Sequence, residues 1–112
     1  MRQIFYRNPY NLEIQYLNGN TPIDLSGYTI TFIIKELFDN SPNDSGALLK
    51  KSVVIPNDTG TKYIFSLSST ETKIKVGKYK SEIQLSNTVG LETTYLTCEQ
   101  DELVIKETLI KE

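Results

Sequence analysis

The chain has 112 residues, of which 12 are basic and 14 acidic, so its formal net charge is −2. The length predicts one domain, residues 1–112, and the charge balance argues against a dedicated nucleic-acid binder, which usually carries a basic surplus. The absence of histidine excludes histidine-based triads and metal ligands, and the single cysteine, Cys98, excludes an internal disulfide and four-cysteine zinc sites. No segment has the pattern of a signal peptide or the apolar length of a membrane span, so we expect a soluble protein made in a cytoplasm.

Apolar and polar side chains alternate with a period of two along most of the chain, as at Tyr28, Ile30, Phe32 and Ile34. This alternation places one set of side chains on one face of a strand, and the β-branched and aromatic residues suit a half-buried sheet. The pattern predicts strands at residues 3–7, 10–17, 28–37, 48–55, 62–68, 78–86, 91–97 and 102–110.

Turn signals separate the predicted strands. Asn18-Gly19 is a strong hairpin signal, because both residues tolerate positive φ. Pro22 has no amide proton, so residues 23–25 are predicted to form an edge or a loop. Further polar turns are expected at residues 39–46, 57–60, 87–90 and 99–102.

Two segments depart from simple alternation. Ser68 and Glu71 have the spacing of a capping box, which predicts one helical turn over residues 69–75. Leu103 and Ile105 share a parity that Glu107 breaks, so a bulge is expected in the last strand. Seven or eight short strands with regular turns favour a sandwich or a barrel.

Gly77-Lys78-Tyr79 opens a predicted strand directly after this turn. The arrangement resembles the tyrosine corner of immunoglobulin-like sandwiches, in which the phenol hydroxyl bonds to upstream backbone. Ser81 occupies the place of the usual disulfide cysteine, and the chain has no tryptophan. A disulfide-free relative of these sandwiches is therefore favoured over an antibody-type domain.

The order of these segments resembles the immunoglobulin-like N-terminal domain of tailed-phage baseplate upper proteins. The resemblance is carried by residues 22–32, which contain Ile-Asp-Leu-Ser-Gly, and by residues 60–67, 77–85, the Gly90 hairpin and 103–105. It covers nearly the whole chain, and its motifs are structural rather than chemical. It implies an all-β, immunoglobulin-like antiparallel β-sandwich of seven to eight strands without a disulfide.

The resemblance also implies a non-catalytic structural module of a phage virion, attached to the baseplate, the tail or an appendage and assembled in the bacterial host cytoplasm. Its expected partners are other virion proteins or further copies of itself, with no nucleic acid, membrane or cofactor. The family usually continues into a fibre or receptor-binding region, and this chain stops at Glu112, so we expect an accessory subunit or another virion location. A small carbohydrate-binding module and a phage-encoded inhibitor of a host protein are the alternatives.

Five loop residues could offer oxygen ligands to calcium: Asp39, Asn43, Asp44, Asn57 and Asp58. Their spacing matches no EF-hand loop, and such residues are common in turns because they bond their own backbone. We therefore predict no metal site.

Two other groups could suggest catalysis. Cys98 has no histidine partner, so it is expected to act as a small apolar residue. Glu99, Asp101 and Glu102 could provide a glycosidase acid and base, although a polar strand connection explains them equally well. We predict that the chain is not an enzyme.

Seven tyrosines raise the alternative of aromatic stacking on sugars or bases. Most lie in phase with the apolar face and should pack in the core, whereas Tyr6 and Tyr95 are the least constrained. The lysines of the central region are interpreted as a solvated face; they are Lys50, Lys51, Lys73, Lys75, Lys78 and Lys80.

The apolar segment Ile4-Phe5-Tyr6 could pair across a subunit boundary or complete the chain's own sheet, and the second interpretation is favoured. From the resemblance we expect self-association or tight binding to a virion protein, weakened when residues 1–7 are deleted.

Overall fold

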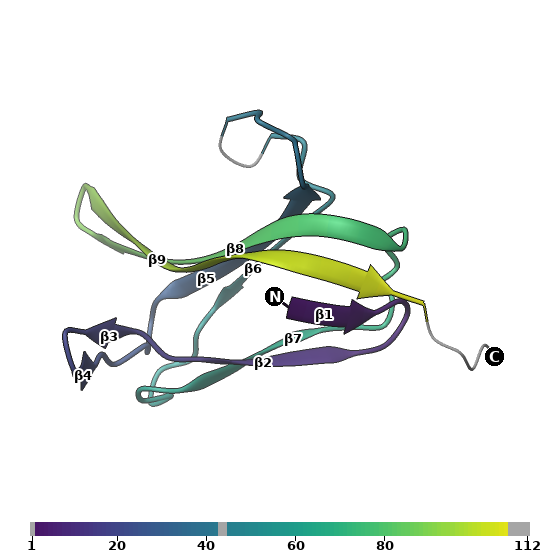
Figure 1. Ribbon diagram of the computed structural model, residues 1–112. Coiled ribbons are helices and arrows are strands. Elements are labelled where there is room, and N and C mark those ends of the chain that lie inside the picture. The colour runs from purple at the N-terminus through teal and green to yellow at the C-terminus, as the bar shows by residue number, and fades with distance from the viewer. Residues whose placement is uncertain (1, 43–44, 108–112) are drawn as a thin grey trace.

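The computed structural model describes residues 2–42 and 45–107, which form two layers of β-strands (Figure 1). The larger sheet, sheet A, has the order β1-β9-β8-β5-β6, and only β1 and β9 are parallel neighbours in it. Its strands are β1 (Arg2–Phe5), β5 (Thr29–Glu36), β6 (Leu49–Val54), β8 (Gly77–Val89) and β9 (Glu92–Lys106). The second layer pairs β2 (Tyr10–Ile14) with β7 (Tyr63–Leu67), and β3 (Leu17–Asn18) with β4 (Thr21–Pro22) form a separate short hairpin. Across these described ranges there is no helix that could cross a lipid bilayer.

The predicted all-β class is confirmed, and six of the predicted strands have a counterpart near the expected place. The last two, 91–97 and 102–110, are wrong as separate strands, because residues 92–106 form the single strand β9. The expected polar turn at 99–102 lies inside it. This strand pairs with β8 along its length, so the backbone groups of its polar residues are satisfied by the ladder.

A β-bulge at Cys98 explains the parity of β9. Ile83 lies opposite Glu99, whereas the next residue of β8, Gln84, lies opposite Thr97, so Cys98 has no partner residue. The extra residue reverses which side chains face the core. The bulge expected between Ile105 and Glu107 does not form, because β9 ends at Lys106, and the bulge of this strand lies at Cys98 instead.

The core lies between the two layers. Phe32 of β5 and Phe65 of β7 stack across it, with ring centroids 5.7 Å apart and an interplanar angle of 28°. The residues buried with them come from both sheets and the connecting loops: Ile4, Ile14, Leu25, Ile30, Ile34, Ile55, Leu67, Tyr79, Ile83, Leu85, Leu103 and Ile105. Alternation thus places the apolar set of each strand inward, as predicted.

The predicted capping box forms, but it does not begin a helix. Glu71 Oε1 accepts a hydrogen bond from the Ser68 amide at 2.8 Å, and the Glu71 amide donates to Ser68 Oγ at 3.2 Å. Residues 69–72 form turns only. Thr72 is buried, and its hydroxyl donates to the Asn8 carbonyl at 2.8 Å. This hydrogen bond joins the turn after β7 to the segment between β1 and β2.

The predicted corner contact at Tyr79 is confirmed. The phenol hydroxyl of Tyr79 donates a hydrogen bond to the backbone carbonyl of Lys75, four residues upstream. The ring is buried at the start of β8, and this burial raises the pKa of Tyr79. The contact fixes the chain where it enters sheet A from the turn after β7.

The N-terminal segment completes the chain's own sheet, as favoured from the sequence. β1 pairs with β9, and the Tyr6 amide donates to the Lys106 carbonyl at 2.8 Å. Ile4 is buried in the core. Deleting residues 1–7 would therefore remove a strand and open the core.

Two predictions for the segment around Pro22 are confirmed, the hairpin and the loop that follows it, but the hairpin turn lies one residue later than expected. Asn18 pairs with Thr21, so the hairpin turn is Gly19-Asn20 rather than Asn18-Gly19, and Gly19 has a φ of 66°. The following residues form a loop, as expected. Leu25 is fully buried there, and its amide donates to the Gly60 carbonyl at 2.8 Å.

A polar groove on the outer face of sheet A

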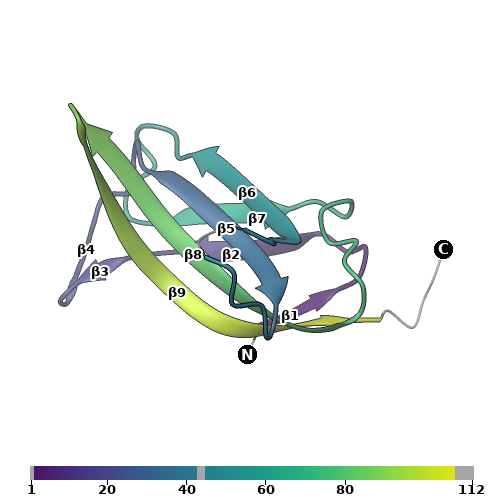
Figure 2. The ribbon, with the colours of Figure 1, turned by 90° about the horizontal axis from the view of Figure 1, so that it is seen from above.

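Sheet A has an outer face that is turned away from β2 and β7 (Figure 2). Polar side chains of four of its strands gather on this face. Alternation sends the apolar residues of β5 and β8 inward and the residues between them outward. The outer side chains line a groove of about 1320 Å³. They are Thr31, Ile33 and Lys35 of β5, Lys50 and Ser52 of β6, Lys80, Glu82, Gln84 and Ser86 of β8, and Tyr95, Gln100 and Glu102 of β9.

Strand register arranges the outer side chains in rows across the sheet. Thr31 lies opposite both Ser52 and Gln84, which makes an uncharged row from β6 to β8. The hydroxyls of Thr31 and Ser52 are 2.9 Å apart and hydrogen bonded. Next along the sheet, Ser86 lies opposite Tyr95. Because the bulge at Cys98 shifts the parity of β9, Tyr95 and Gln100 both reach this face.

The opposite end of the groove is charged, and its lysines bond to the loop that follows β5. Lys80 donates a hydrogen bond to the Asp39 carbonyl, and Lys35 donates to the Ser41 carbonyl at 2.9 Å. Lys35 is buried as a result. The side chain and amide of Ser41 donate to the Asp39 carboxylate, which lowers the pKa of Asp39.

Two projections rise on either side of this face. Figure 1 shows the loop after β5 and the tip of the β8–β9 hairpin both pointing away from β2 and β7.

The three calcium candidates that the structure describes do not come together. Asp39 follows the end of β5, whereas Asn57 and Asp58 follow the end of its antiparallel neighbour β6, so the two groups lie at opposite ends of the strand pair. Asn43 and Asp44 lie outside the described residues. Within 2–42 and 45–107, no three histidine, cysteine, aspartate or glutamate side chains are grouped to hold a metal ion.

Of the three carboxylates considered from the sequence, strand alternation puts Glu102 on the face opposite to that of Glu99 and Asp101. Glu99 lies opposite the buried residue Ile83 and forms an ion pair with Arg2 of β1. Glu102 lies opposite Lys80, in the groove. Asp101 accepts a hydrogen bond from the Glu102 amide at 2.8 Å. The acid and base pairing considered from the sequence is not formed by Glu99 and Glu102.

Cys98 is half-buried at the bulge. Burial, with a smaller effect from Glu99, raises its pKa to about 11. A thiol with this pKa is almost fully protonated at neutral pH and is a poor nucleophile. Its environment agrees with the small apolar role expected from the sequence.

Most tyrosines pack against the core, as the alternation predicts, and Tyr6, which was expected to be less constrained, does so too. Tyr6 packs against the core together with Tyr10, Tyr16, Tyr28 and Tyr63. Tyr95 is 63% exposed and lies in the groove. Of the two tyrosines considered least constrained, only Tyr95 is available to a ligand.

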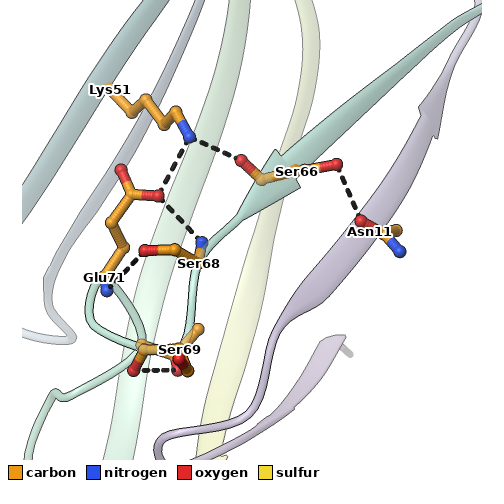
Figure 3. A network of polar contacts seen from close by, with 7 residues as sticks. Asn11, Lys51, Ser66, Ser68, Ser69 and Glu71 are labelled. Carbon is orange, nitrogen blue, oxygen red and sulfur yellow. Dashed lines mark hydrogen bonds and ion pairs between the residues drawn. The ribbon is translucent and has the colours of Figure 1, made fainter.

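The lysine group is not one solvated face. Lys73, Lys75 and Lys78 are exposed, but Lys50 and Lys80 line the groove. Lys51 points to the other side of β6, where it bonds the Ser66 carbonyl at 2.7 Å and Glu71 at 2.9 Å (Figure 3). The ammonium group also lies 5.6 Å from the centre of the Phe65 ring. Lys51 therefore links β6 to β7 and to the turn that follows β7.

The groove was not predicted from the sequence. The sequence does contain its polar residues, since Thr31, Gln84 and Ser86 alternate with inward-facing residues. Only the register between β5 and β8 shows that these residues are neighbours. No protein-family model matches the chain, and no curated protein shows significant sequence similarity to it.

Proposed function

We propose that this chain is a non-catalytic, immunoglobulin-like structural module of a tailed-phage virion. It is held in the baseplate, the tail or an appendage by contacts with other virion proteins or with further copies of itself, and it assembles in the host cytoplasm. The strand order and one projecting hairpin support this proposal.

The strand order supports the immunoglobulin-like part. In such domains strands C, F and G share a sheet, variable-type domains add C′ beside C, and B and E lie in the opposite sheet. Strands β5, β8 and β9 have the positions of C, F and G, with β6 as C′ and β2 paired with β7 as B with E. Tyr79, two residues before Ser81, has the corner position near the start of F.

The observation that carries the assembly function is the β8–β9 hairpin. Its ladder continues to Val89 opposite Glu92, beyond the second layer, and closes through Gly90-Leu91 (Figure 1). Val89 is 74% exposed, and Leu91 is fully exposed. Two apolar side chains at the tip of this hairpin present a compact surface that a partner protein can cover, and burying each contributes about 1.5–3 kcal/mol.

The test replaces the apolar tip. We expect the double variant Val89→Ser/Leu91→Ser to fold normally, because neither side chain contacts the core, but to be lost from purified phage particles or from complexes with co-expressed virion proteins. The control is Val54→Ser/Ile64→Ser, which removes two other apolar residues that are 66% and 54% exposed. Equal recovery of both double variants would contradict the proposal.

A further inference from the structure

The floor of the outer groove offers uncharged hydrogen-bonding groups to a ligand. Ser52, Thr31 and Gln84 lie side by side on three strands and line the groove together. They present two hydroxyls and one amide. The hydroxyls of Thr31 and Ser52 bond each other, which uses one donor and leaves the second hydroxyl proton, the remaining oxygen lone pairs and the Gln84 amide for a ligand. This combination matches the hydroxyl groups of sugars, which also donate and accept.

Tyr95 adds an aromatic surface at the uncharged end. It lies opposite Ser86, next to the row of Ser52, Thr31 and Gln84, and it is 63% exposed. An exposed ring is costly to leave in water and can stack on a flat ligand while its hydroxyl remains hydrated. The ring therefore supplies an aromatic stacking surface beside the polar row, in addition to the apolar side chain of Ile33 in the groove.

Three of the charged groups of the groove, on Lys35, Lys80 and Glu82, are already bonded within the chain. Lys80 and Lys35 donate to loop carbonyls, and Gln100 donates to Glu82. Charges satisfied in this way would have to give up existing bonds to hold an ionic ligand. The groove therefore suits an uncharged ligand better than an acidic polymer. Because its floor is largely polar, the groove is also a poor match for an apolar protein surface.

We propose that this groove binds a neutral polysaccharide chain, with Tyr95 stacking on one sugar ring and Gln84, Thr31 and Ser52 bonding its hydroxyls. From Lys80 to Ser86 the floor extends along seven residues of β8, which are six steps of ~3.3 Å or about 20 Å, and this length accommodates several sugar units. This binding does not depend on the assembly function, because it uses the sheet face and not the hairpin tip.

Affinity electrophoresis in native gels tests the proposal with dextran, hydroxyethylcellulose and mannan as neutral probes and alginate as an acidic one. We expect retardation by at least one neutral probe. Tyr95→Ala should weaken it at least tenfold, on the order of the loss of one aromatic stacking contact. Gln84→Ala should weaken it about threefold to tenfold, as for one hydrogen bond.

Tyr95→Phe, which keeps the ring, should retain most of the binding, and Gln15→Ala, at an exposed position outside the groove, should retain all of it. No retardation by any neutral probe, retardation by alginate alone, or binding unchanged in Tyr95→Ala would each overturn the proposal. The tip variant Val89→Ser/Leu91→Ser should still bind, so a failure of the assembly proposal is distinguishable from a failure of this one.

Discussion

Lys51 of β6 and Glu71, in the turn after β7, form an ion pair of 2.9 Å that joins the two layers of the sandwich (Figure 3). Their side chains are 29% and 28% exposed, so water screens the attraction in part. A double-mutant cycle of Lys51→Met and Glu71→Gln, measured by urea unfolding, should therefore give a coupling free energy of about 0.5–1 kcal/mol. A coupling near zero would mean that the two residues stabilise the fold independently.

The same pair predicts a dependence of stability on pH. Partial burial alone would raise the pKa of Glu71, but hydrogen bonds from Ser68 and Lys51 outweigh this effect, so the pKa of Glu71 lies below its usual value. A carboxylate with a depressed pKa stabilises the fold above its unfolded pKa of about 4.3, and this contribution is lost as the pH falls through the folded pKa.

The difference in unfolding free energy between wild type and Glu71→Gln should consequently be largest at neutral pH and should shrink below about pH 4. Glu92→Gln is the control, because Glu92 is exposed on the hairpin and no ion pair is found for it in the described parts of the chain. A difference that persists unchanged at low pH would contradict the assigned role of the Glu71 carboxylate.

Tyr79→Phe removes the hydroxyl that bonds the Lys75 carbonyl and leaves the buried ring in place. The expected loss of stability is about 1–3 kcal/mol, because the buried carbonyl loses its partner. Chemical denaturation measures this loss against Tyr63→Phe, a half-buried tyrosine for which the described residues show no hydroxyl hydrogen bond. Equal denaturation midpoints for the two variants would show that the corner contact does not stabilise the domain.

Cys98 should react slowly with iodoacetamide in the folded protein. With a pKa of about 11, its thiolate fraction at neutral pH falls roughly 300-fold below that of a free cysteine of pKa about 8.5, and its greater intrinsic nucleophilicity recovers roughly tenfold of this. Mass spectrometry at pH 7.5 should therefore show alkylation on the order of 20-fold slower in the native protein than in urea. Equal rates would place the thiol in an open, unperturbed environment.

Gly46 and Gly60 both have positive φ, at 75° and 83°, but differ in their surroundings. A Cβ at Gly46 would collide with the Asp39 carboxylate, which Ser41 holds in place, whereas a Cβ at Gly60 meets open space. Gly60→Ala should cost about 1 kcal/mol from backbone strain alone, and Gly46→Ala should cost more because it also disrupts the Asp39–Ser41 bonds. Thermal unfolding compares the two, and an equal cost would contradict this account of the loop.

The strands around Phe32 and Tyr79 could be predicted because their alternation is regular and their inward faces are strongly apolar. The continuity of β9 could not, since its polar residues resemble a turn until the long ladder with β8 is known. The groove depends on the register between Ser52, Thr31 and Gln84, which are far apart in the sequence. A one-residue bulge at Cys98 determines which side chains of β9 face the groove, and the local composition does not specify where the bulge lies.

The most direct test of the proposed assembly function is a search for this chain in a reconstruction of intact tailed-phage particles, at a resolution that traces strands. The account predicts that the chain occupies a fixed, repeated position on the tail or an appendage, with Val89 and Leu91 covered by a neighbouring protein. Particles that lack the chain, or that hold it with both tip residues open to solvent, would contradict it.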